Sequence, residues 1–264
     1  MIQAITSMKD AFMLSGKTAI ITGGNGGIGL GIAHAMAEMG ANIAILCRNM
    51  EKAASALDQL RPYGGRYEAY PCDITQSQSV AAAVEAVWKD LGDVEILVNN
   101  SGVAGGGKLL DADPDLSAWR QVIETDLVGM MQVTHEAGKR MRDAGKGGSI
   151  INITSNTGAI VNRGGFLAVY GAAKAGANYF TKSMAVELGE FNIRVNAIAP
   201  GYTRAGLGAN PGEYLYKLVE AQQPLKRLGE AIEIGALAVF LASPAAAHIT
   251  GEIITIDGGY TLQA

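Results

Sequence analysis

The fold of this chain is decided by the stretch TGGNGGIG at residues 22–29. The stretch follows an apolar run at residues 17–22, which predicts a buried strand, and it opens a helix-like segment at residues 29–39. Glycine lets the backbone turn sharply and approach a phosphate group closely, and a helix N-terminus offers free N–H groups with a partial positive charge. Between a strand and a helix, such a loop predicts a dinucleotide-binding site. Without that context it would indicate only a tight turn.

Short apolar runs alternate with longer helix-like segments over the rest of the chain. The further expected strands are 41–46, 67–71, 94–98, 149–153, 193–197 and 252–256, and the further expected helices are 51–60, 77–91, 117–143, 170–188 and 231–242. Strands that are apolar on both faces and alternate with helices are typical of a parallel sheet with right-handed crossovers. We therefore expect one α/β domain over residues 1–264. Its core is a Rossmann-type doubly wound sheet of seven mainly parallel strands with helices on both faces, and residues 1–16 precede it as an extension.

The composition is that of a globular protein and excludes several functions. Hydrophobic residues make up 48% and charged residues 17% of the 264 residues, so the chain can bury a large core. The net charge of −4, without a basic run, disfavours nucleic acid and anionic membranes as partners. Two cysteines form no disulfide framework, and three scattered histidines indicate no metal site. No bilayer-spanning stretch or secretory signal is recognisable, so we expect a cytoplasmic protein.

The end of the second expected strand bears on the choice of dinucleotide. An NAD site usually has Asp or Glu there, which binds the ribose hydroxyls and would repel a 2′-phosphate. Here the strand is followed by Arg48 and Asn49, with no acid before Glu51. The planar guanidinium of Arg48 suits a phosphate, which favours NADP(H), with NAD(H) as the second candidate. As an alternative, Arg48 is a solvated surface charge.

The segment 203–229 lies between the sixth strand and the last helix and contains no clear strand. Ligands of doubly wound sheets bind beyond the carboxyl ends of the strands, so we interpret this irregular segment as a substrate lid. An ordinary surface loop is the alternative. The lid offers aromatic side chains such as Tyr214 and Tyr216 and polar side chains such as Asn210 and Gln222.

Seven motifs, in order, resemble those of the short-chain dehydrogenase/reductase family in its compact single-domain form. Besides the glycine loop they include NNSG at residues 99–102, YGAAK at 170–174 and NAIAPG at 196–201, and the resemblance runs from residue 17 to residue 259. It implies a nicotinamide-dependent oxidoreductase that interconverts a small-molecule carbonyl and a secondary alcohol. Together with Arg48, the expected cofactor-binding residues are Thr22, Gly23, Asn25, Gly27, Ile28, Gly29, Asp73, Ile74, Asn100, Gly102, Tyr170, Lys174, Pro200, Gly201 and Thr203.

The candidate catalytic residues are Ser155, Tyr170 and Lys174. Tyr170 and Lys174 lie one helical turn apart and so share a helix face. A free phenol has a pKa of about 10, and a neighbouring ammonium favours its phenolate form, so such a tyrosine can serve as general acid or base. The hydroxyl of Ser155 can stabilise charge on the same substrate oxygen. The resemblance also implies that Lys174 holds the nicotinamide ribose.

The chain departs from the family pattern at two site positions. Asp126 aligns with the family's catalytic asparagine, which helps to hold a water beside the lysine, so Asp126 is a fourth catalytic candidate whose part in a proton relay stays open. Ala205 stands where the family often has threonine, and Thr203 is the candidate for contacting the nicotinamide carboxamide.

Two features of the sequence bear on the substrate. Residues 158–163 resemble those of polyol dehydrogenases and of ketose or keto-sugar-acid reductases, and the lid offers several hydrogen-bonding groups. We therefore expect a polyol, ketose or sugar-acid substrate. The alternatives are a reductase of larger apolar ketones, such as steroids or 3-oxoacyl thioesters, and a nicotinamide-binding sensor with little turnover. The family resemblance also implies a homotetramer.

Overall fold

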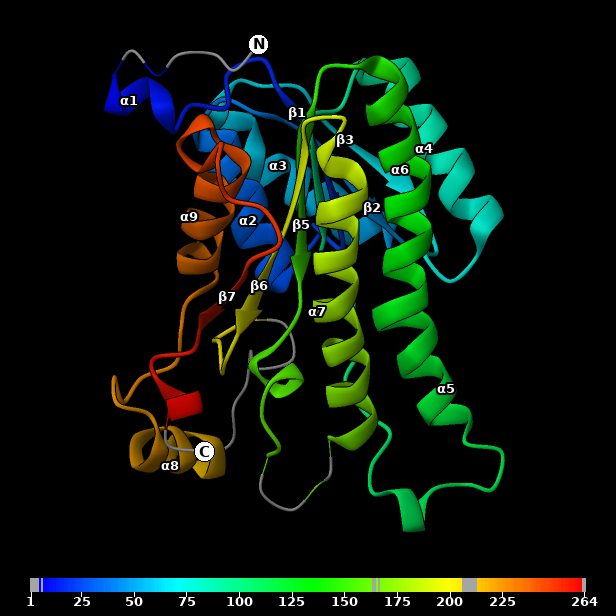
Figure 1. The fold of residues 1–264 in the computed structure, drawn as a ribbon, viewed down its shortest axis with the longest axis vertical. Helices are drawn as coiled ribbons and strands as arrows, with labels where there is room; N and C mark the ends of the chain where they lie inside the picture. Colours follow the sequence, from blue (N-terminus) through cyan, green and yellow to red (C-terminus); the bar gives the residue numbers. More distant parts are fainter. Residues whose placement is uncertain (1–4, 6, 163–164, 166, 206–212, 263–264) are drawn as a thin grey trace.

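The computed structural model describes residues 5, 7–162, 165, 167–205 and 213–262, and it contains a seven-stranded sheet (Figure 1). The strand order is β3-β2-β1-β4-β5-β6-β7, and each neighbouring pair is parallel. The strands are β1 Thr18–Thr22, β2 Asn42–Cys47, β3 Tyr67–Pro71, β4 Ile96–Asn99, β5 Gly148–Ile153, β6 Ile193–Pro200 and β7 Ile253–Ile256. The expected doubly wound sheet is confirmed.

Helices cover both faces of this sheet (Figure 1). Helices α2, α3 and α9 pack on one face, whereas α4, α6 and α7 pack on the other. The helices are α1 Met8–Ala11, α2 Gly27–Glu38, α3 Met50–Leu60, α4 Ser77–Leu91, α5 Ser117–Ile123, α6 Met130–Ala144, α7 Ala168–Gly189, α8 Glu213–Gln222 and α9 Ala231–Ala242. Within the described residues, no helix combines the length and the apolar character that crossing a bilayer requires.

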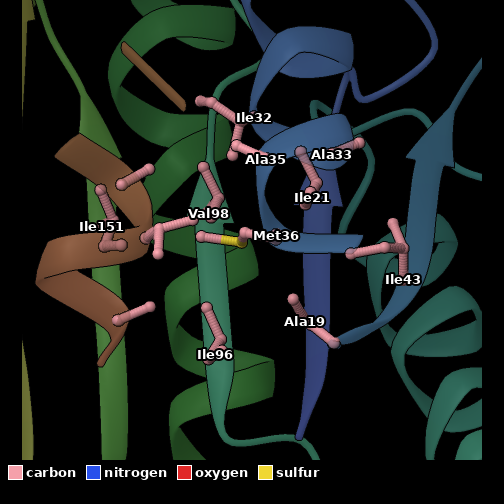
Figure 2. Packing of buried hydrophobic residues seen from close by; sticks show 14 of the residues in the cluster. Ala19, Ile21, Ile32, Ala33, Ala35, Met36, Ile43, Ile96, Val98 and Ile151 are labelled. Atoms are coloured by element: carbon pink, nitrogen blue, oxygen red, sulfur yellow. The ribbon is translucent and has the colours of Figure 1, made fainter. Parts of the chain in front are cut away.

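The core consists of two apolar layers, one on each side of the sheet. Neighbouring side chains of a strand point to opposite faces, so Ile20 of β1 packs in one layer and Ile21 in the other. Figure 2 shows the layer beneath α2, where Met36 lies close to Val98 and Ile21. Burial on both faces explains why the central strands are continuously apolar instead of alternating.

Two sequence-based expectations about regular structure are wrong. The single long helix expected at residues 117–143 is divided by a π-helical segment, η3 Glu124–Gly129, between α5 and α6. The segment 203–229, expected to be irregular, contains helix α8. Element ends also differ by a few residues: α2 begins at Gly27, two residues before its expected start, and β6 continues to Pro200.

The strand order fixes where a ligand can bind. Successive strands of the first half run outward from β1 to β3, and those of the second half run outward from β4 to β7 on the other side. The loops that follow β1 and β4 therefore leave the same sheet edge in opposite directions and open a crevice between them. The glycine loop follows β1, and the segment Asn100-Ser101-Gly102 follows β4.

Helices α2 and α9 approach each other closely at a place where each helix has a glycine. A Cβ atom added to Gly31 of α2 would lie 2.5 Å from the Cβ of Ala231 and 2.7 Å from its carbonyl carbon. A Cβ atom on Gly235 of α9 would lie 2.7 Å from the carbonyl oxygen of Gly31. This contact sets the distance between the helix that carries the glycine loop and the helix that follows the lid.

We predict that Gly31→Ala lowers the free energy of unfolding by about 1–3 kcal/mol, because the added methyl forces the two helices apart. Chemical denaturation monitored by circular dichroism measures the change. Gly189→Ala at the end of α7 is the matched control, because its added methyl meets no atom within 4 Å. Equal stability of the Gly31→Ala variant and the wild type would contradict the tight α2–α9 contact.

Candidate active site

A cavity of about 660 Å³ opens at the carboxyl ends of the strands. Its wall is formed by the segments that follow β1 to β6, together with α7 and the π-helical segment η3. It extends from Arg48, which follows β2, to Tyr170 and Thr203 near the lid. The cavity therefore has the elongated lining that a dinucleotide with a substrate beside it requires.

The glycine loop is held against the segment after β4 by hydrogen bonds. The hydroxyl oxygen of Thr22 accepts hydrogen bonds from the main-chain N–H groups of Asn100 and Ser101, both at 2.9 Å. The Asn100 amide donates to the carbonyl oxygen of Thr22 at 2.9 Å. A Cβ atom on Gly29 would clash with the carbonyl oxygen of Gly23 and lie 2.5 Å from the Asn100 amide nitrogen. Only glycine fits there while the loop keeps this shape.

The loop presents the N-terminus of α2 to the cavity. Gly27 has φ of 57°, which favours glycine, and Gly26 at the N-cap has no side chain to bond the N–H groups of the first turn. Such N–H groups and the helix dipole favour an anion. Gly23, Asn25 and Ile28 of the loop line the cavity.

Two cations and one carboxylate lie at the end of the cavity near β2 and β3. Arg48 and Lys52 line it from the segment after β2 and the first turn of α3. A Cβ atom on Gly26 would clash with the Lys52 ammonium, so this cation lies against the glycine loop. Asp73 and Ile74 line the wall after β3, and hydrogen bonds from the Thr75 N–H and hydroxyl hold the pKa of Asp73 below its ordinary value.

Two thiols also line this end of the cavity. Cys47 and Cys72 are buried, and burial raises the pKa of both, that of Cys72 to about 11. They are therefore protonated at neutral pH and unsuited to nucleophilic catalysis. Among the residues that the structure describes, no cluster of three or more His, Cys, Asp or Glu side chains could hold a metal ion.

At the other end, Ser155, Tyr170 and Lys174 line the same cavity. Ser155 follows β5, and its hydroxyl oxygen accepts a hydrogen bond from the Thr157 N–H at 3.2 Å, so it also caps the short turn Asn156–Gly158. Tyr170 and Lys174 share one face of α7, and the Lys174 ammonium lies 5.5 Å from the centroid of the Tyr170 ring. A phenol, an ammonium and a hydroxyl that line the same part of a cavity can together move a proton to or from a substrate oxygen.

The fourth catalytic candidate, Asp126, is fully buried behind this group. One of its carboxylate oxygens lies 3.1 Å from the Lys174 ammonium, and the other accepts a hydrogen bond from the Val103 N–H at 2.7 Å. Burial raises the pKa of Asp126 above its ordinary value, although the Lys174 ammonium and the Val103 N–H act in the opposite direction.

The segment after β6 closes the cavity on the lid side. Pro200, Gly201 and Thr203 line it, and the Thr203 hydroxyl donates to the Gly201 carbonyl oxygen at 3.2 Å. A Cβ atom on Gly201 would lie 2.5 Å from the Cβ of Asp257, so the chain passes close to the segment after β7. Ala205 lines the cavity with Thr203.

Of the predicted cofactor-binding residues, all but three line the cavity. Thr22, Gly27 and Gly29 lie outside the lining and instead shape the loop, as described above. Sequence reasoning missed Lys52, and the available signal was its position in the first turn of the helix that follows Arg48. It also missed Asn156 and Thr157, and it treated Asn162 only as part of a family-like stretch. All three line the cavity near Tyr170. Asn210 of the lid lies outside the described residues.

These residues fit a nicotinamide dinucleotide. The glycine cradle and helix N-terminus suit its pyrophosphate, and the Tyr170–Lys174–Ser155 group lies at the opposite end of the cavity. The fold and the site thus define a nicotinamide-dependent oxidoreductase.

Comparisons with known proteins identify the family. Residues 22–261 match the family model described as enoyl-(acyl carrier protein) reductase. The chain is 35% identical to a sorbose reductase of Candida albicans, over 98% of this chain and 92% of that protein. It is 35% identical to the NADP-dependent mannitol dehydrogenase of Alternaria alternata, over 98% of this chain and 97% of that protein. It is 39% identical to the D-threitol dehydrogenase of Mycolicibacterium smegmatis, over 96% of this chain and 95% of that protein.

Solved structures agree with this result. A short-chain type dehydrogenase/reductase from Mycobacterium marinum matches with a TM-score of 0.92 at 36% identity, over 97% of this chain and 99% of that one. A 7α-hydroxysteroid dehydrogenase complexed with NADH and 7-oxo glycochenodeoxycholic acid matches with a TM-score of 0.89 at 35% identity, over 96% and 98%. The chain belongs to the short-chain dehydrogenase/reductase family, and it is an NAD(P)-dependent enzyme acting on CH–OH groups.

We predict that Tyr170→Phe reduces turnover by about 10²–10⁴-fold, because the variant lacks the hydroxyl that exchanges the proton. NADPH binding, measured by fluorescence titration, should be retained. The matched control is Tyr179→Phe, which removes the hydroxyl of a 75% exposed tyrosine on the same helix. Turnover retained in Tyr170→Phe would place the acid/base elsewhere.

Proposed function

We propose that this enzyme is an NADP(H)-preferring oxidoreductase that interconverts a carbonyl and a secondary alcohol on a hydroxyl-rich substrate of the polyol, ketose or sugar-acid type. The observation that carries the substrate class is the concentration of polar side chains beside Tyr170. Asn156, Thr157 and Asn162 line the cavity there together with Ser155.

These polar groups are held in place by other parts of the protein. The Asn156 amide donates to the Asp257 carboxylate at 3.3 Å, and the Asn162 amide donates to the Thr157 hydroxyl at 3.1 Å. Both asparagines are less than 8% exposed. Fixed polar groups in a cavity favour a substrate whose hydroxyls match them, because an unmatched buried polar group is costly.

The activities for which three relatives are named support the same substrate class. These relatives are a sorbose reductase, a mannitol dehydrogenase and a D-threitol dehydrogenase. The 7α-hydroxysteroid dehydrogenase supports the second candidate, a larger apolar ketone, and Val103, Leu167 and Tyr202 give the cavity apolar surface for one.

The preference for NADP(H) rests on the two cations after β2. Arg48 and Lys52 both line the cavity, and Lys52 lies against Gly26, so a 2′-phosphate placed between loop and helix would meet both. The relative from Alternaria alternata is named as NADP-dependent. The complexed 7α-hydroxysteroid dehydrogenase contains NADH, which keeps NAD(H) as the second candidate.

In the proposed reaction, Tyr170 and Ser155 act on the substrate oxygen. During oxidation the Tyr170 phenolate takes the proton of the substrate hydroxyl. During reduction the phenol returns a proton to the carbonyl oxygen. The Ser155 hydroxyl donates a hydrogen bond to the same oxygen, and the Lys174 ammonium favours the phenolate form of Tyr170. A nicotinamide cofactor held in this cavity would supply or accept the hydride.

The domain and assembly predictions are part of this proposal. We infer one domain in which residues 203–229 serve as the substrate lid. The two ends of the segment meet in a bridge between Thr203 and Gly229, and Arg204 donates to the Tyr216 hydroxyl of α8 at 2.7 Å. We also propose a cytoplasmic location and a homotetramer, and the exposed apolar side chains Tyr179 and Val186 on α7 offer a surface through which copies of the chain can associate.

A panel of ketones tests the substrate class. With NADPH, fructose or 5-ketogluconate should be reduced with a kcat/KM at least about tenfold above that of a steroid ketone. Asn162→Ala should lower kcat/KM for the hydroxyl-rich ketones and leave the steroid ketone less affected. A higher kcat/KM for the steroid would support the second candidate. Tight NADPH binding without turnover on any ketone would identify a sensor.

We predict that Arg48→Ala raises the KM for NADPH by about tenfold or more, because a charge-assisted contact to the 2′-phosphate is lost, and changes the KM for NADH much less. Lys52→Ala should act in the same direction. Steady-state kinetics with both cofactors measure the ratio of the KM for NADPH to the KM for NADH in each variant. Lys89→Ala, which removes an exposed cation of α4 that does not line the cavity, is the control. Equal effects on NADPH and NADH would contradict the role of Arg48.

A further inference from the structure

The catalytic candidate Lys174 has a charged partner. Its ammonium lies 3.1 Å from the Asp126 carboxylate, where the family resemblance places a neutral asparagine. The side chains are 4% and 0% exposed, so water screens the pair only weakly. The Asp126 carboxylate therefore partly offsets the effect that the positive charge of Lys174 has on Tyr170.

Backbone contacts hold both charges in position. The Lys174 ammonium donates to the Ile153 carbonyl oxygen of β5 at 3.2 Å, and the Val103 N–H donates to Asp126 at 2.7 Å. Asp126 reaches this place from the π-helical segment η3, and a Cβ atom on Gly102 would lie 2.9 Å from its carboxylate. The carboxylate is thus packed between α7 and the segment after β4.

The other ionisable groups of the neighbouring segments lie farther away, pair with other residues or are exposed to solvent. The far end of the cavity is lined by the ionisable side chains of the β2 and β3 ends, the segments that follow them and the first turn of α3, namely Cys47, Arg48, Lys52, Cys72 and Asp73. From the segment after β6, Arg204 pairs with Glu230 at 3.1 Å, and on η3 itself Glu124 is exposed. The segments after β4 and β5 contribute the main-chain groups of Val103 and Ile153 and the hydroxyl of Ser155.

We propose that Asp126 is a positioning residue that acts through Lys174 and raises the pH at which Tyr170 becomes the base for alcohol oxidation. The proposal rests on the proposed role of Tyr170 as the acid/base. An anion beside the Tyr170–Lys174 pair disfavours loss of a proton from that pair, whichever of the two groups loses it. With asparagine in its place, the proton leaves at lower pH.

The sign of the effect follows from charge alone. Removing the negative charge leaves the ammonium uncompensated, so the phenolate of Tyr170 is stabilised and forms at lower pH. The contacts of Asp126 with the Lys174 ammonium at 3.1 Å and the Val103 N–H at 2.7 Å favour its ionised form, against the burial that raises its pKa. A purely structural role of Asp126 would change stability or kcat without moving a pH midpoint.

The test is Asp126→Asn, which keeps the shape of the side chain and an acceptor for the Val103 N–H. In the presence of saturating NADP⁺, kcat/KM for alcohol oxidation is measured from about pH 6 to about pH 10. We expect the midpoint of the rise to fall by about 1 pH unit or more. Asp126→Glu, which keeps the charge, should restore a midpoint near that of the wild type.

Glu124→Gln is the matched control, since it removes the same charge from an exposed position on the same π-helical segment and should leave the midpoint unchanged. An unchanged midpoint in Asp126→Asn would overturn the proposal.

A second measurement needs neither substrate nor turnover. The ionisation of Tyr170 is titrated from the ultraviolet absorbance of tyrosinate, as the difference between Asp126→Asn and the same variant with Tyr170→Phe. The corresponding wild-type difference is the reference. A midpoint below the wild-type value supports the proposal and an equal or higher one refutes it, even if the ketone panel shows that the substrate class is wrong.

Discussion

The site depends on the close approach of the glycine loop to the segment that follows β4. Gly29 leaves no room for a side chain next to the Gly23 carbonyl and the Asn100 amide, and Thr22 binds two N–H groups of the neighbouring segment. These contacts join the two halves of the sheet at the point where the strand order reverses. The same contacts direct the N-terminus of α2 towards the cavity and place Gly102 next to Asp126. One packing constraint therefore sets the geometry of both ends of the cavity.

Much of this arrangement could be predicted from the sequence, because its causes are local or periodic. Continuous apolar runs indicated the buried parallel strands, and glycines between a strand and a helix indicated the loop. The four-residue spacing placed Tyr170 and Lys174 on one helix face, and both line the cavity with Ser155. Arg48 lines the cavity as well, since it directly follows a strand whose carboxyl end forms the wall, and its contact with a 2′-phosphate stays a prediction.

The features that escaped prediction depend on contacts between distant segments. Lys52 is an ordinary exposed lysine in the first turn of a helix until tertiary packing brings it against Gly26. The π-helical segment at Asp126 has no recognisable sequence period, and the partners of Asp126, Lys174 and Val103, come from distant parts of the chain. Helix α8 was overlooked because a stretch near glycines and prolines resembles a loop when no partner surface is known.

The two cysteines have a practical meaning. Cys47 and Cys72 are 6% and 4% exposed, and burial keeps their thiols protonated at the wall next to Arg48 and Asp73. Alkylating agents and oxidants react with exposed thiolates, so we expect these two thiols to react slowly with both while the protein stays folded. Labelling of these thiols would instead report local opening of the protein around β2 and β3, so they can serve as native probes of motion at this end of the cavity.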